Sequence, residues 1–529
     1  MSEKSETTEK MTKHSPGLRD NDSVVAGRSV TTTDLTQAMN HHHHGPGLQK
    51  NFSLLSLIGI ALVVSNTWAG VGGSILVAIF NGGPPGVLYE FLVVATFYCF
   101  VSASLAELAS AIPSSAGVYH WATITPGKAY GRLNGFLAGW WNYLAWVCAS
   151  ASMAFIWSNT IVQIYRLRNP DFDPQAWHVF VIYLISTWLA CLIVCFFNSA
   201  MPHLNTVGMF IGLFGFLGTV ISLAVLPGRA TGSGYASNSF VWKEWKADLG
   251  YPSGFVFVAG MLNGAYGVGV PDVVSHLAEE IPNPRRNVPL AMGFQMAVAI
   301  VTGFSYLVTL MYCITDYDGL FESPFPLAEI YLQGTGSTAG CIGLLLVLLS
   351  TIGLGMCGLY VTAGRTLWTL SRDHATPFHS KLSEIHGRFH MPLWSTLFTA
   401  VLVTALGCIY VGSTTAFNAF VGAYVLMSSS SYLAAILPHL LTARRNVVYG
   451  PFQMPKAVGY LVNGVACSYM LIWFVIYCFP YSLPVTAANM NYSPLIWGGM
   501  TLILGTWWLV TGSKRYQGPP EEVLALLSR

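Results

Sequence analysis

Long apolar runs separated by short polar segments dominate the chain from about residue 53 onwards. A run of about 20 apolar residues is long enough to cross the hydrocarbon core of a bilayer as a helix. The pattern therefore predicts twelve membrane-spanning helices. Their expected ranges are 53–80, 85–111, 132–162, 177–197, 204–226, 253–277, 290–315, 338–364, 392–412, 415–441, 457–480 and 494–512.

Lysine and arginine predict which side of the membrane each connection faces, because cytosolic loops carry an excess of them. With the N-terminus in the cytosol, the inner connections hold Lys128, Arg132, Arg285, Arg286, Arg365, Arg372, Lys381, Arg388, Arg444, Arg445 and Lys456. The outer connections hold only Arg166, Arg168, Arg229, Lys243 and Lys246. We therefore expect both termini to be cytosolic, which agrees with an even number of spans.

Two of the predicted spans are interrupted by glycine and proline. The first reads NTWAGVGGS at Asn66–Ser74, and the sixth reads GMLNGAYGVGVPD at Gly260–Asp272. Irregular backbone is tolerated at membrane depth only where it is buried or lines a cavity. Paired breaks at corresponding positions of two halves are a pointer to the substrate site of a transporter built from inverted repeats.

The breaks supply a set of candidate substrate-binding residues, which are Gly70, Gly72, Gly73 and Ser74 in the first span and Tyr266, Gly267 and Gly269 in the sixth. We expect a half-helix to begin near Ser74 and to present N–H groups to a carboxylate. Carbonyl groups near Gly264–Tyr266 would then suit an ammonium group. The alternative is that these glycines serve close helix packing, which is common in membranes.

Composition supports a membrane protein and excludes several other classes. Of the 529 residues, 53% are hydrophobic and 9% are charged, whereas soluble domains carry roughly 25% charged residues. The net charge of +2 and the absence of a basic stripe argue against nucleic-acid binding. The ten cysteines form no CxxC pair, so neither a metal site nor a disulfide framework is predicted. No catalytic or cofactor motif appears, and we expect neither an enzyme nor a cofactor.

Four acidic residues lie within or beside the apolar runs, namely Glu90, Glu107, Asp272 and Glu329. Ionisable groups at membrane depth are costly and invite a functional hypothesis. Asp272, directly after the second break, is a candidate for binding a cationic substrate or a coupling proton, and its alternative role is a helix N-cap. Glu107 is expected to hold an inner-loop arginine or backbone, Glu90 could snorkel towards the outer surface, and Glu329 could lie in an outer loop.

Other residues suggest a gate, a cation site and a modification site. Arg285 and Arg286 could form an inner-gate ion pair with Glu279 or Glu280, or could serve topology alone. A quaternary ammonium group needs aromatic faces, and Trp68 and Tyr266 adjoin the two breaks.

Asn491 begins a glycosylation sequon, but Pro494 and the nearby last span argue against its use. A run of histidines, His41–His44, lies in the polar N-terminal tail, where we expect neither order nor a signal peptide.

The segments NTWAGVGGS, AELASAIPSSAGVYHWA (Ala106–Ala122) and AEEIPNPRRNVPLA (Ala278–Ala291) together resemble the amino acid–polyamine–organocation (APC) permease superfamily. Within it the chain is similar to the fungal amino acid/choline transporter (ACT) family, over about Leu48 to Arg515. The resemblance implies an all-α polytopic membrane protein of twelve transmembrane helices, with a LeuT-like 5+5 inverted repeat and two C-terminal helices. It also implies a plasma-membrane permease, often driven by protons.

According to this resemblance, the chain divides into six parts. These are a disordered cytosolic tail at 1–50, a first repeat at 51–226, an outer loop at 227–252, a second repeat at 253–441, helices 11 and 12 at 442–512 and a cytosolic tail at 513–529. One departure bears on coupling, since some proton-coupled relatives carry a lysine in the fifth span facing the first break. Here that span has no lysine, and His203 stands only at its start.

The sequence predicts a secondary transporter that imports a small amine or amino acid across the plasma membrane by alternating access. Choline, GABA, a polyamine or another amino acid are alternative substrates, and a proton is the expected coupling ion. A sensor of the same fold that binds without transporting is the alternative function.

Overall fold

The computed structural model describes residues 53–229, 234–323, 325–412, 416–487, 489–516 and 518–519. The predicted tail at 1–50 with its histidine run, and most of the predicted tail at 513–529, lie outside these residues. Within the described ranges, 12 helical segments are long and apolar enough to span a membrane. The predicted number of spans and the all-α class are therefore confirmed.

Most spans are single helices. They are α4 (Gly83–Ala111), α6 (Gly131–Arg168), α7 (Ala176–Phe196), α8 (Met201–Val225), α12 (Pro284–Tyr312), α15 (Thr338–Arg372), α17 (Leu393–Gly412), α18 (Ala416–Leu441), α19 (Lys456–Ile476) and α20 (Ser493–Trp507). Shorter helices lie in the connections, namely α5 (Val118–Ile124), α9 (Asn238–Trp242), α13 (Gly319–Glu322), α14 (Pro326–Thr335), α16 (His379–Leu382) and α21 (Ser513–Arg515).

The first span is broken into α2 (Leu54–Ser65) and α3 (Thr67–Gly73). Ser53 begins α2 with a capping box, in which its side chain and that of Ser56 each accept a backbone N–H. The helix stops at Asn66, whose backbone angles of φ −23° and ψ 65° are not helical. The chain then re-enters a helix at once and ends it at Ser74.

The sixth span consists of α10 (Ser253–Gly260), α11 (Leu262–Val268) and a 3-10 helix at Val273–Glu280. Its main interruption falls at Gly269–Asp272, as the sequence predicts. Pro271 within this stretch cannot donate a backbone hydrogen bond, which accounts for the end of α11. A single residue, Met261, whose backbone angles are in the right-handed helical region, separates α10 from α11.

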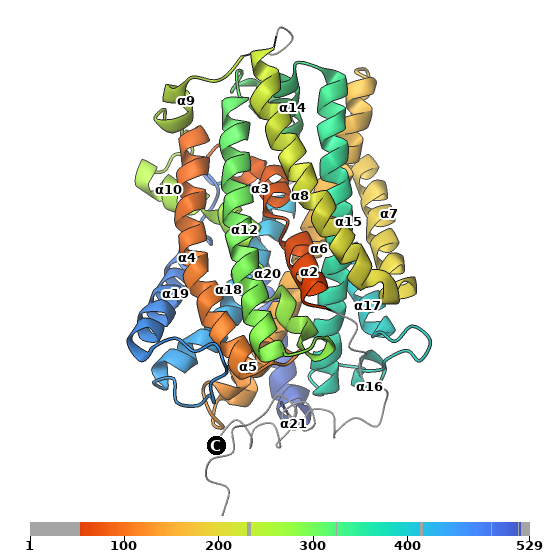
Figure 1. Cartoon of the computed structure of the whole chain (residues 1–529), viewed down its shortest axis with the longest axis vertical. Coiled ribbons are helices and arrows are strands. Elements are labelled where there is room, and N and C mark those ends of the chain that lie inside the picture. Colours follow the sequence, from red (N-terminus) through yellow and green to blue (C-terminus); the bar gives the residue numbers. More distant parts are fainter. Residues whose placement is uncertain are drawn as a thin grey trace, which may run out of the picture.

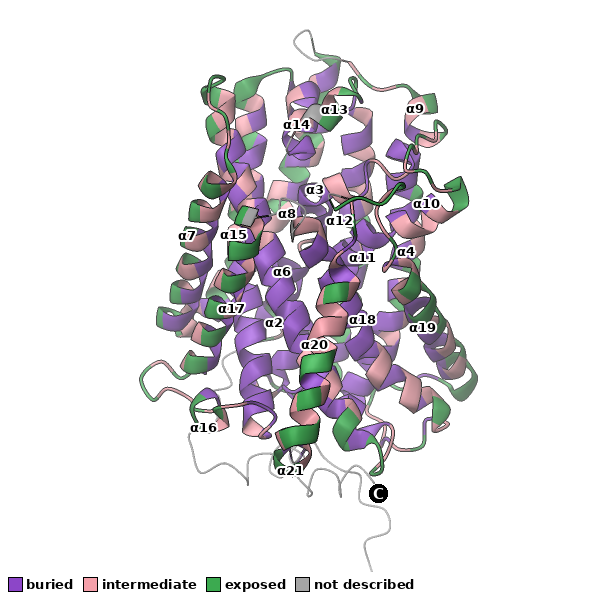
Figure 2. Ribbon diagram, turned by 180° about the vertical axis from the view of Figure 1, so that it is seen from behind, coloured by how far each residue is buried: buried purple, intermediate pink, exposed green. Residues whose placement is uncertain are grey.

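The helices form one elongated bundle whose long axis is vertical in Figure 1. α6 packs along α18 and α15, and α4 packs along α12. Figure 2 shows buried residues concentrated on α2, α6 and α18 in the middle, while α7, α19 and α20 show exposed faces. Exposed apolar side chains on the outer helices, such as Phe214, Leu461 and Leu502, are what a lipid environment requires.

The two ends of the bundle differ in composition. We call the end with α5, α16 and α21 the basic end, because Arg365, Arg372 and Arg444 lie there; it is at the bottom of Figure 1. We call the opposite end, with α9, α13 and α14, the α9 end. The excess of arginine and lysine predicts that the basic end faces the cytosol.

Candidate functional site

Two cavities flank the break in the first span. The central cavity lies between α2, α3, α6, α11, α15 and α18. It is lined by Val64, Ser65, Asn66, Gly70, Ala149, Met153, Tyr266, Gly267, Val270, Leu359 and Tyr424. Residues of both broken spans thus meet in one cavity, as the paired breaks predict.

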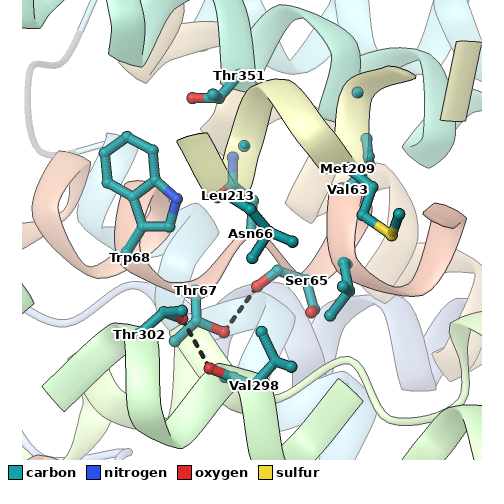
Figure 3. Close-up of a pocket in the computed structure, with 14 residues that line it drawn as sticks. Val63, Ser65, Asn66, Thr67, Trp68, Met209, Leu213, Val298, Thr302 and Thr351 are labelled. Atoms are coloured by element: carbon teal, nitrogen blue, oxygen red, sulfur yellow. Dashed lines mark hydrogen bonds between the residues drawn. The ribbon is translucent and has the colours of Figure 1, made fainter. Parts of the chain in front are cut away.

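The lateral cavity lies on the other side of the same break, between α2, α3, α8, α12 and α15. It is lined by Leu62, Val63, Ser65, Asn66, Thr67, Trp68, Gly208, Met209, Gly212, Leu213, Val298, Ala299, Thr302 and Thr351. Figure 3 shows this cavity, with Ser65, Asn66 and Thr67 beside the indole of Trp68. Ser65 and Asn66 line both cavities, so the non-helical residue at the break separates them.

Both cavities are uncharged and small. No acidic or basic side chain is among the described residues that line either one. The face of α8 that reaches the break carries Gly208, Met209, Gly212 and Leu213. The central cavity has a volume of about 20 Å³, enough for about one water molecule. A substrate of amino-acid size therefore requires the surrounding helices to move apart.

Side-chain hydrogen bonds join the two broken spans to each other. The Thr67 hydroxyl donates to the carbonyl of Gly267 at 3.0 Å, and the Ser74 hydroxyl donates to the Asn263 side-chain oxygen at 2.5 Å. The Asn263 amide in turn donates to the carbonyl of Val71 at 3.3 Å. Because these groups are buried, breaking the bonds would leave polar groups unsatisfied. α3 and α11 are therefore held together as one unit.

Other side chains donate hydrogen bonds to the carbonyl groups that the sixth-span break frees. The hydroxyl of Tyr424 donates to the carbonyl of Gly269, and the hydroxyl of Tyr432 lies 3.2 Å from the same carbonyl while its shorter contact is with Asp272. The amide of Gln295 donates to the carbonyl of Val270 at 2.8 Å. The break is therefore built into the surrounding scaffold, with partners from α18 and α12.

The first break lies at Asn66, the first residue of the predicted stretch NTWAGVGGS, whereas the glycines of that stretch remain helical. A Cβ atom built on Gly72 would lie 2.6 Å from the ring of Tyr306, and one on Gly73 would lie 2.5 Å from Ile156. Gly267 likewise faces Val71 at 2.3 Å. Gly72 and Gly73 serve close packing, whereas Gly70 and Gly267 also line the central cavity. Gly269 is the C-cap of α11, at the predicted second break.

Only a 3-10 helix of three residues, Ile75–Val77, follows Ser74, in place of the predicted half-helix. Ser74 is also the C-cap of α3: its backbone N–H donates to the carbonyl of Gly70 at 3.0 Å, and its hydroxyl shares its one proton between that carbonyl, at 2.7 Å, and the Asn263 oxygen. The Ser74 N–H group is therefore occupied and turned away from any carboxylate. The polar pair Ser65–Asn66 inside an apolar run is the signal that marks the true break.

The two aromatic candidates lie in different cavities. Tyr266 lines the central cavity, its hydroxyl shares a hydrogen bond of 2.7 Å with Ser152, and its ring meets Tyr424 edge-on with centroids 5.7 Å apart. Trp68 lines the lateral cavity and packs edge-on against Tyr306 at 5.3 Å. Tyr424, which the sequence did not single out, is thus the aromatic partner of Tyr266.

Asp272 lies outside the residues that line both cavities and is fully buried. Its carboxylate accepts hydrogen bonds from the amide of Asn142 at 2.7 Å and from the hydroxyl of Tyr432, and it lies 3.2 Å from Nε2 of His276. Asp272 does occupy the N-cap position of the 3-10 helix Val273–Glu280, as the alternative predicts, but its side chain makes no cap hydrogen bond to that helix. Asp272 instead joins α6 and α18 to the sixth span.

The gate residues are paired differently from the prediction. Glu280 forms a buried ion pair with Arg365, and Glu279 pairs with Arg372 at 3.2 Å. Both partners come from the end of α15 rather than from Arg285 and Arg286. Glu279 also accepts the backbone N–H of Ser115 at 3.2 Å. The end of the sixth span is therefore bound to α15 at the basic end.

Arg285 and Arg286 follow the sixth span at the same end. Arg285 donates to the carbonyl groups of Ser110 and Tyr449, at 3.1 and 2.9 Å. Arg286 is exposed. Arg285 therefore joins the end of α4 to the connection that precedes α19.

Glu107 does hold an inner-loop arginine, as expected. Its carboxylate lies 2.6 Å from Arg444 and accepts the backbone N–H of Met454 at 2.7 Å. Nearby, Asp373 bonds to His120 and Tyr119 and lies 3.6 Å from Arg372. Burial raises the pKa of Asp373, but its bond to His120 and the charges of His120 and Arg372 outweigh this and leave the pKa below its ordinary value.

Burial corrects the expectation for Glu90 and agrees with the one for Asn491. Glu90 does not snorkel, because it is only 2% exposed. Asn491 is also 2% exposed, and its amide donates to the carbonyl groups of Tyr477 and Phe479. A glycosylating enzyme cannot reach it in this position. Glu329 lies on α14 and accepts a bond from Gln333 at 3.1 Å.

Comparison with known proteins identifies the family. Residues 52–500 match the family described as amino acid permease. The choline transporter of Saccharomyces cerevisiae is 29% identical over 482 residues, covering 90% of this chain and 84% of that protein. A putative amino acid/polyamine transporter of Macrophomina phaseolina is 28% identical over 447 residues, covering 83% and 96%.

A solved structure shares the fold. The manganese transporter of Eremococcus coleocola superposes with a TM-score of 0.50 at 13% identity, covering 93% of this chain and 98% of that one. Such low identity carries the fold alone, and that fold is LeuT-like, as predicted. The chain is therefore a multi-pass integral membrane protein of the amino acid permease (APC) family, an amino acid/choline-type transporter rather than an enzyme.

Proposed function

We propose that this protein imports a small amine or amino acid, with choline and GABA as the leading substrates, across the plasma membrane by alternating access. Both termini lie in the cytosol, and uptake is coupled to protons. The observation that carries the proposal is the central cavity, where Asn66 and Gly70 of the first span meet Tyr266 and Gly267 of the sixth. A polyamine is a further candidate substrate.

The lining of the central cavity offers partners for both substrate classes. The rings of Tyr266 and Tyr424 can face a quaternary or primary ammonium group, and each such contact is worth about 0.5–2 kcal/mol. The hydroxyl of Ser65 and the amide of Asn66 can donate hydrogen bonds to a hydroxyl or a carboxylate. These residues replace the predicted Ser74 and Trp68 in the binding site. Asp272 supports the break from outside the cavity.

Movement between two states follows from the hydrogen bonds between the broken spans. Because α3 and α11 are joined at Thr67–Gly267 and Ser74–Asn263, we expect them to move together against α6, α15 and α18. That movement has to enlarge the central cavity from the volume of a single water to that of a substrate. The basic-end ion pairs of Glu279 and Glu280 then act as an inner gate, which breaks when the site opens to the cytosol.

The test is uptake of radiolabelled choline, GABA, putrescine and neutral amino acids by yeast lacking its own choline and GABA permeases, at pH 5 and pH 7.5. We expect uptake of at least one amine or amino acid, faster at pH 5. Tyr266→Ala and Tyr424→Ala should each raise the KM for choline about 3- to 30-fold. Tyr165→Phe, an exposed change on α6, is the control.

Three results would contradict the proposal. Uptake of none of these compounds by protein shown to be at the cell surface would remove the transport assignment. Binding of one of them to the purified protein without flux into vesicles would favour the sensor alternative. Uptake that Tyr266→Ala and Tyr424→Ala leave unchanged would place the substrate elsewhere.

A further inference from the structure

Glu90 differs from the other acidic residues within the predicted spans because it lacks a partner. It lies on α4, about 10 Å along the helix from the first residue, Gly83. The side chain is 2% exposed. Among the residues that the structure describes, neither carboxylate oxygen has a hydrogen-bond partner. Asp272 and Glu107, by contrast, are each held by several donors.

The carboxylate of Glu90 lies directly against the backbone of the sixth span. A Cβ atom built on Gly260 would be 2.3 Å from both of its oxygens, so only glycine allows this approach. Gly260 is the last residue of α10, which the single residue Met261 separates from α11. Glu90 therefore contacts the junction between α10 and α11.

The groups that surround Glu90 offer no compensating charge. α10 and α9 carry no titratable side chain. On α11 and α12, the hydroxyl groups of Tyr266, Tyr306 and Tyr312 are bonded to Ser152, Tyr331 and Asn238. At the end of α19, Tyr477 shares a hydrogen bond with Tyr469 at 3.4 Å. On α18, Tyr424 and Tyr432 are bonded to Gly269.

The remaining charged and titratable groups are also directed elsewhere. Lys246, in the connection before α10, has its ammonium over the rings of Phe240 and Tyr317. The nearby Lys243, Glu244 and Asp248 are exposed. The charged groups of α5, α12, α18 and α19 are at the basic end, and they include His120, Arg285, Arg286, His439 and Lys456. On α4 itself, Tyr89 is exposed and Glu107 is paired with Arg444, whereas the buried Tyr98, eight residues beyond Glu90, offers a hydroxyl group but no positive charge.

We propose that Glu90 is a proton-binding site, and that the α9 end closes over the substrate only when this carboxyl group is neutral. This proposal rests on the transport function proposed above. An ionised carboxylate with no donor or counter-charge is costly to bury. A neutral carboxyl group can rest against the Gly260 backbone at a much smaller cost. The closed arrangement of α4 and α10 therefore selects the protonated form.

The position of α10 makes this selection a step of the transport cycle. Of the eight residues of α10, only Val256 and Gly260 are buried, so the helix can leave α4 without opening the core. Once α10 moves away, water reaches Glu90 and the carboxyl group can exchange a proton with the outer medium. Closure then needs a proton taken from outside, and it becomes faster as the outer pH falls.

The experiment uses the full-length protein and the isosteric variant Glu90→Gln, which is permanently neutral. Infrared spectra of reconstituted wild type minus Glu90→Gln, recorded at pH 7.5, test the protonation state without any substrate. We expect the wild type to show the carbonyl stretch of a protonated carboxyl group that the variant lacks. Glu244→Gln, which removes an exposed carboxylate, is the control and should produce no such difference.

Uptake of radiolabelled choline and GABA at pH 5 and pH 7.5 tests the link to transport. The wild type should be several-fold faster at pH 5, and in Glu90→Gln this ratio should fall to near one, with uptake at pH 7.5 at or above the wild-type rate. Glu90→Asp, which keeps a titratable group, should retain a ratio above one. If either variant is absent from the cell surface, the other still separates titration from folding.

Two results would overturn the proposal. One is a wild-type spectrum without a protonated carboxyl group that depends on Glu90. The other is a Glu90→Gln variant that keeps the wild-type pH ratio. If the wild type takes up no probe, the transport proposal fails, whereas the infrared difference still decides whether Glu90 holds a proton.

Discussion

The two ends of the bundle are held closed by different interactions. At the basic end, carboxylates of α4 and the sixth span pair with Arg365, Arg372 and Arg444. At the α9 end, no ion pair joins the described residues, and the contacts are aromatic and backbone ones. There Tyr317 donates to the carbonyl of Ile79 at 2.9 Å, and Gly82 bridges to Lys246.

This difference implies that different substitutions will open the two ends of the bundle. Removing one member of a buried ion pair leaves the other charge uncompensated, which is strongly destabilising. Aromatic and backbone contacts lose less when one member is removed, because no charge is left behind. We therefore expect the loss of an arginine at the basic end to shift the protein towards opening there, and the loss of a side-chain contact at the α9 end to have a smaller effect.

The largest effect is expected for Arg365→Met. Loss of the arginine leaves Glu280, which is 4% exposed, as an unpaired buried charge. This change should destabilise the closed basic end by about 3–5 kcal/mol. Thermal unfolding of the purified protein and thiol labelling from the basic side measure this. Arg388→Met, an exposed arginine, is the control. The double variant Arg365→Met with Glu280→Gln should recover much of the lost stability. If it recovers none, the unpaired Glu280 is not the cause of the loss.

Gly82→Ala tests the α9 end where it is most constrained. Gly82 has φ +85°, and an added Cβ would lie 2.4 Å from the ring of Trp245. The strained backbone and the clash together should cost about 2–3 kcal/mol in unfolding free energy. Gly254→Ala, whose Cβ meets nothing within 4 Å, is the matched control and should not lower the unfolding temperature. An equal loss in both variants would contradict the argument.

Arg372→Met should have an intermediate effect. Its partner Glu279 is 13% exposed, so water can partly replace the arginine, and we expect a loss of about 1–2 kcal/mol. The unfolding temperature in low and high salt is the measurement. High salt should weaken the wild-type pair and reduce the difference between the two proteins. A loss as large as that of Arg365→Met would show that partial exposure is not what distinguishes the pairs.

The smallest effect is expected for Lys246→Met. The ammonium lies 4.6 Å from the centroid of the Tyr317 ring, a contact worth about 0.5–1 kcal/mol at an exposed site. Lys243→Met, an exposed neighbour, is the control for the lost charge. A loss at Lys246 as large as that at Arg365 would remove the distinction between the two ends.

The number of spans and the sixth-span break could be predicted because they depend on local sequence. Twenty apolar residues need a helix, and Pro271 removes a backbone donor wherever it lies. The first break was misplaced for a physical reason, since Gly72 and Gly73 can stay helical when Tyr306 and Ile156 pack against them. The local sequence does not show which residues of other helices will pack against these glycines.

The pairing of charges could not be predicted for the same reason. Glu280 and Arg365 are far apart in the chain and meet only because the sixth span ends beside α15. Tyr424 is identified as a binding-site candidate only by the structure, in which α18 packs beside α11. Glu107, by contrast, was assigned a loop arginine correctly, because its position near the predicted inner face left such residues within reach.

The uncharged lining of the central cavity has an electrical consequence. With no lining acid or base, the site does not neutralise the net charge of what it holds. A monovalent cation that passes through it carries one elementary charge across the membrane, and each 100 mV of potential contributes about 2.3 kcal/mol. A cell interior at −100 mV could thus concentrate choline about 50-fold on the charge of choline alone, whereas a zwitterion would gain from the voltage only through the charge of a proton that moves with it.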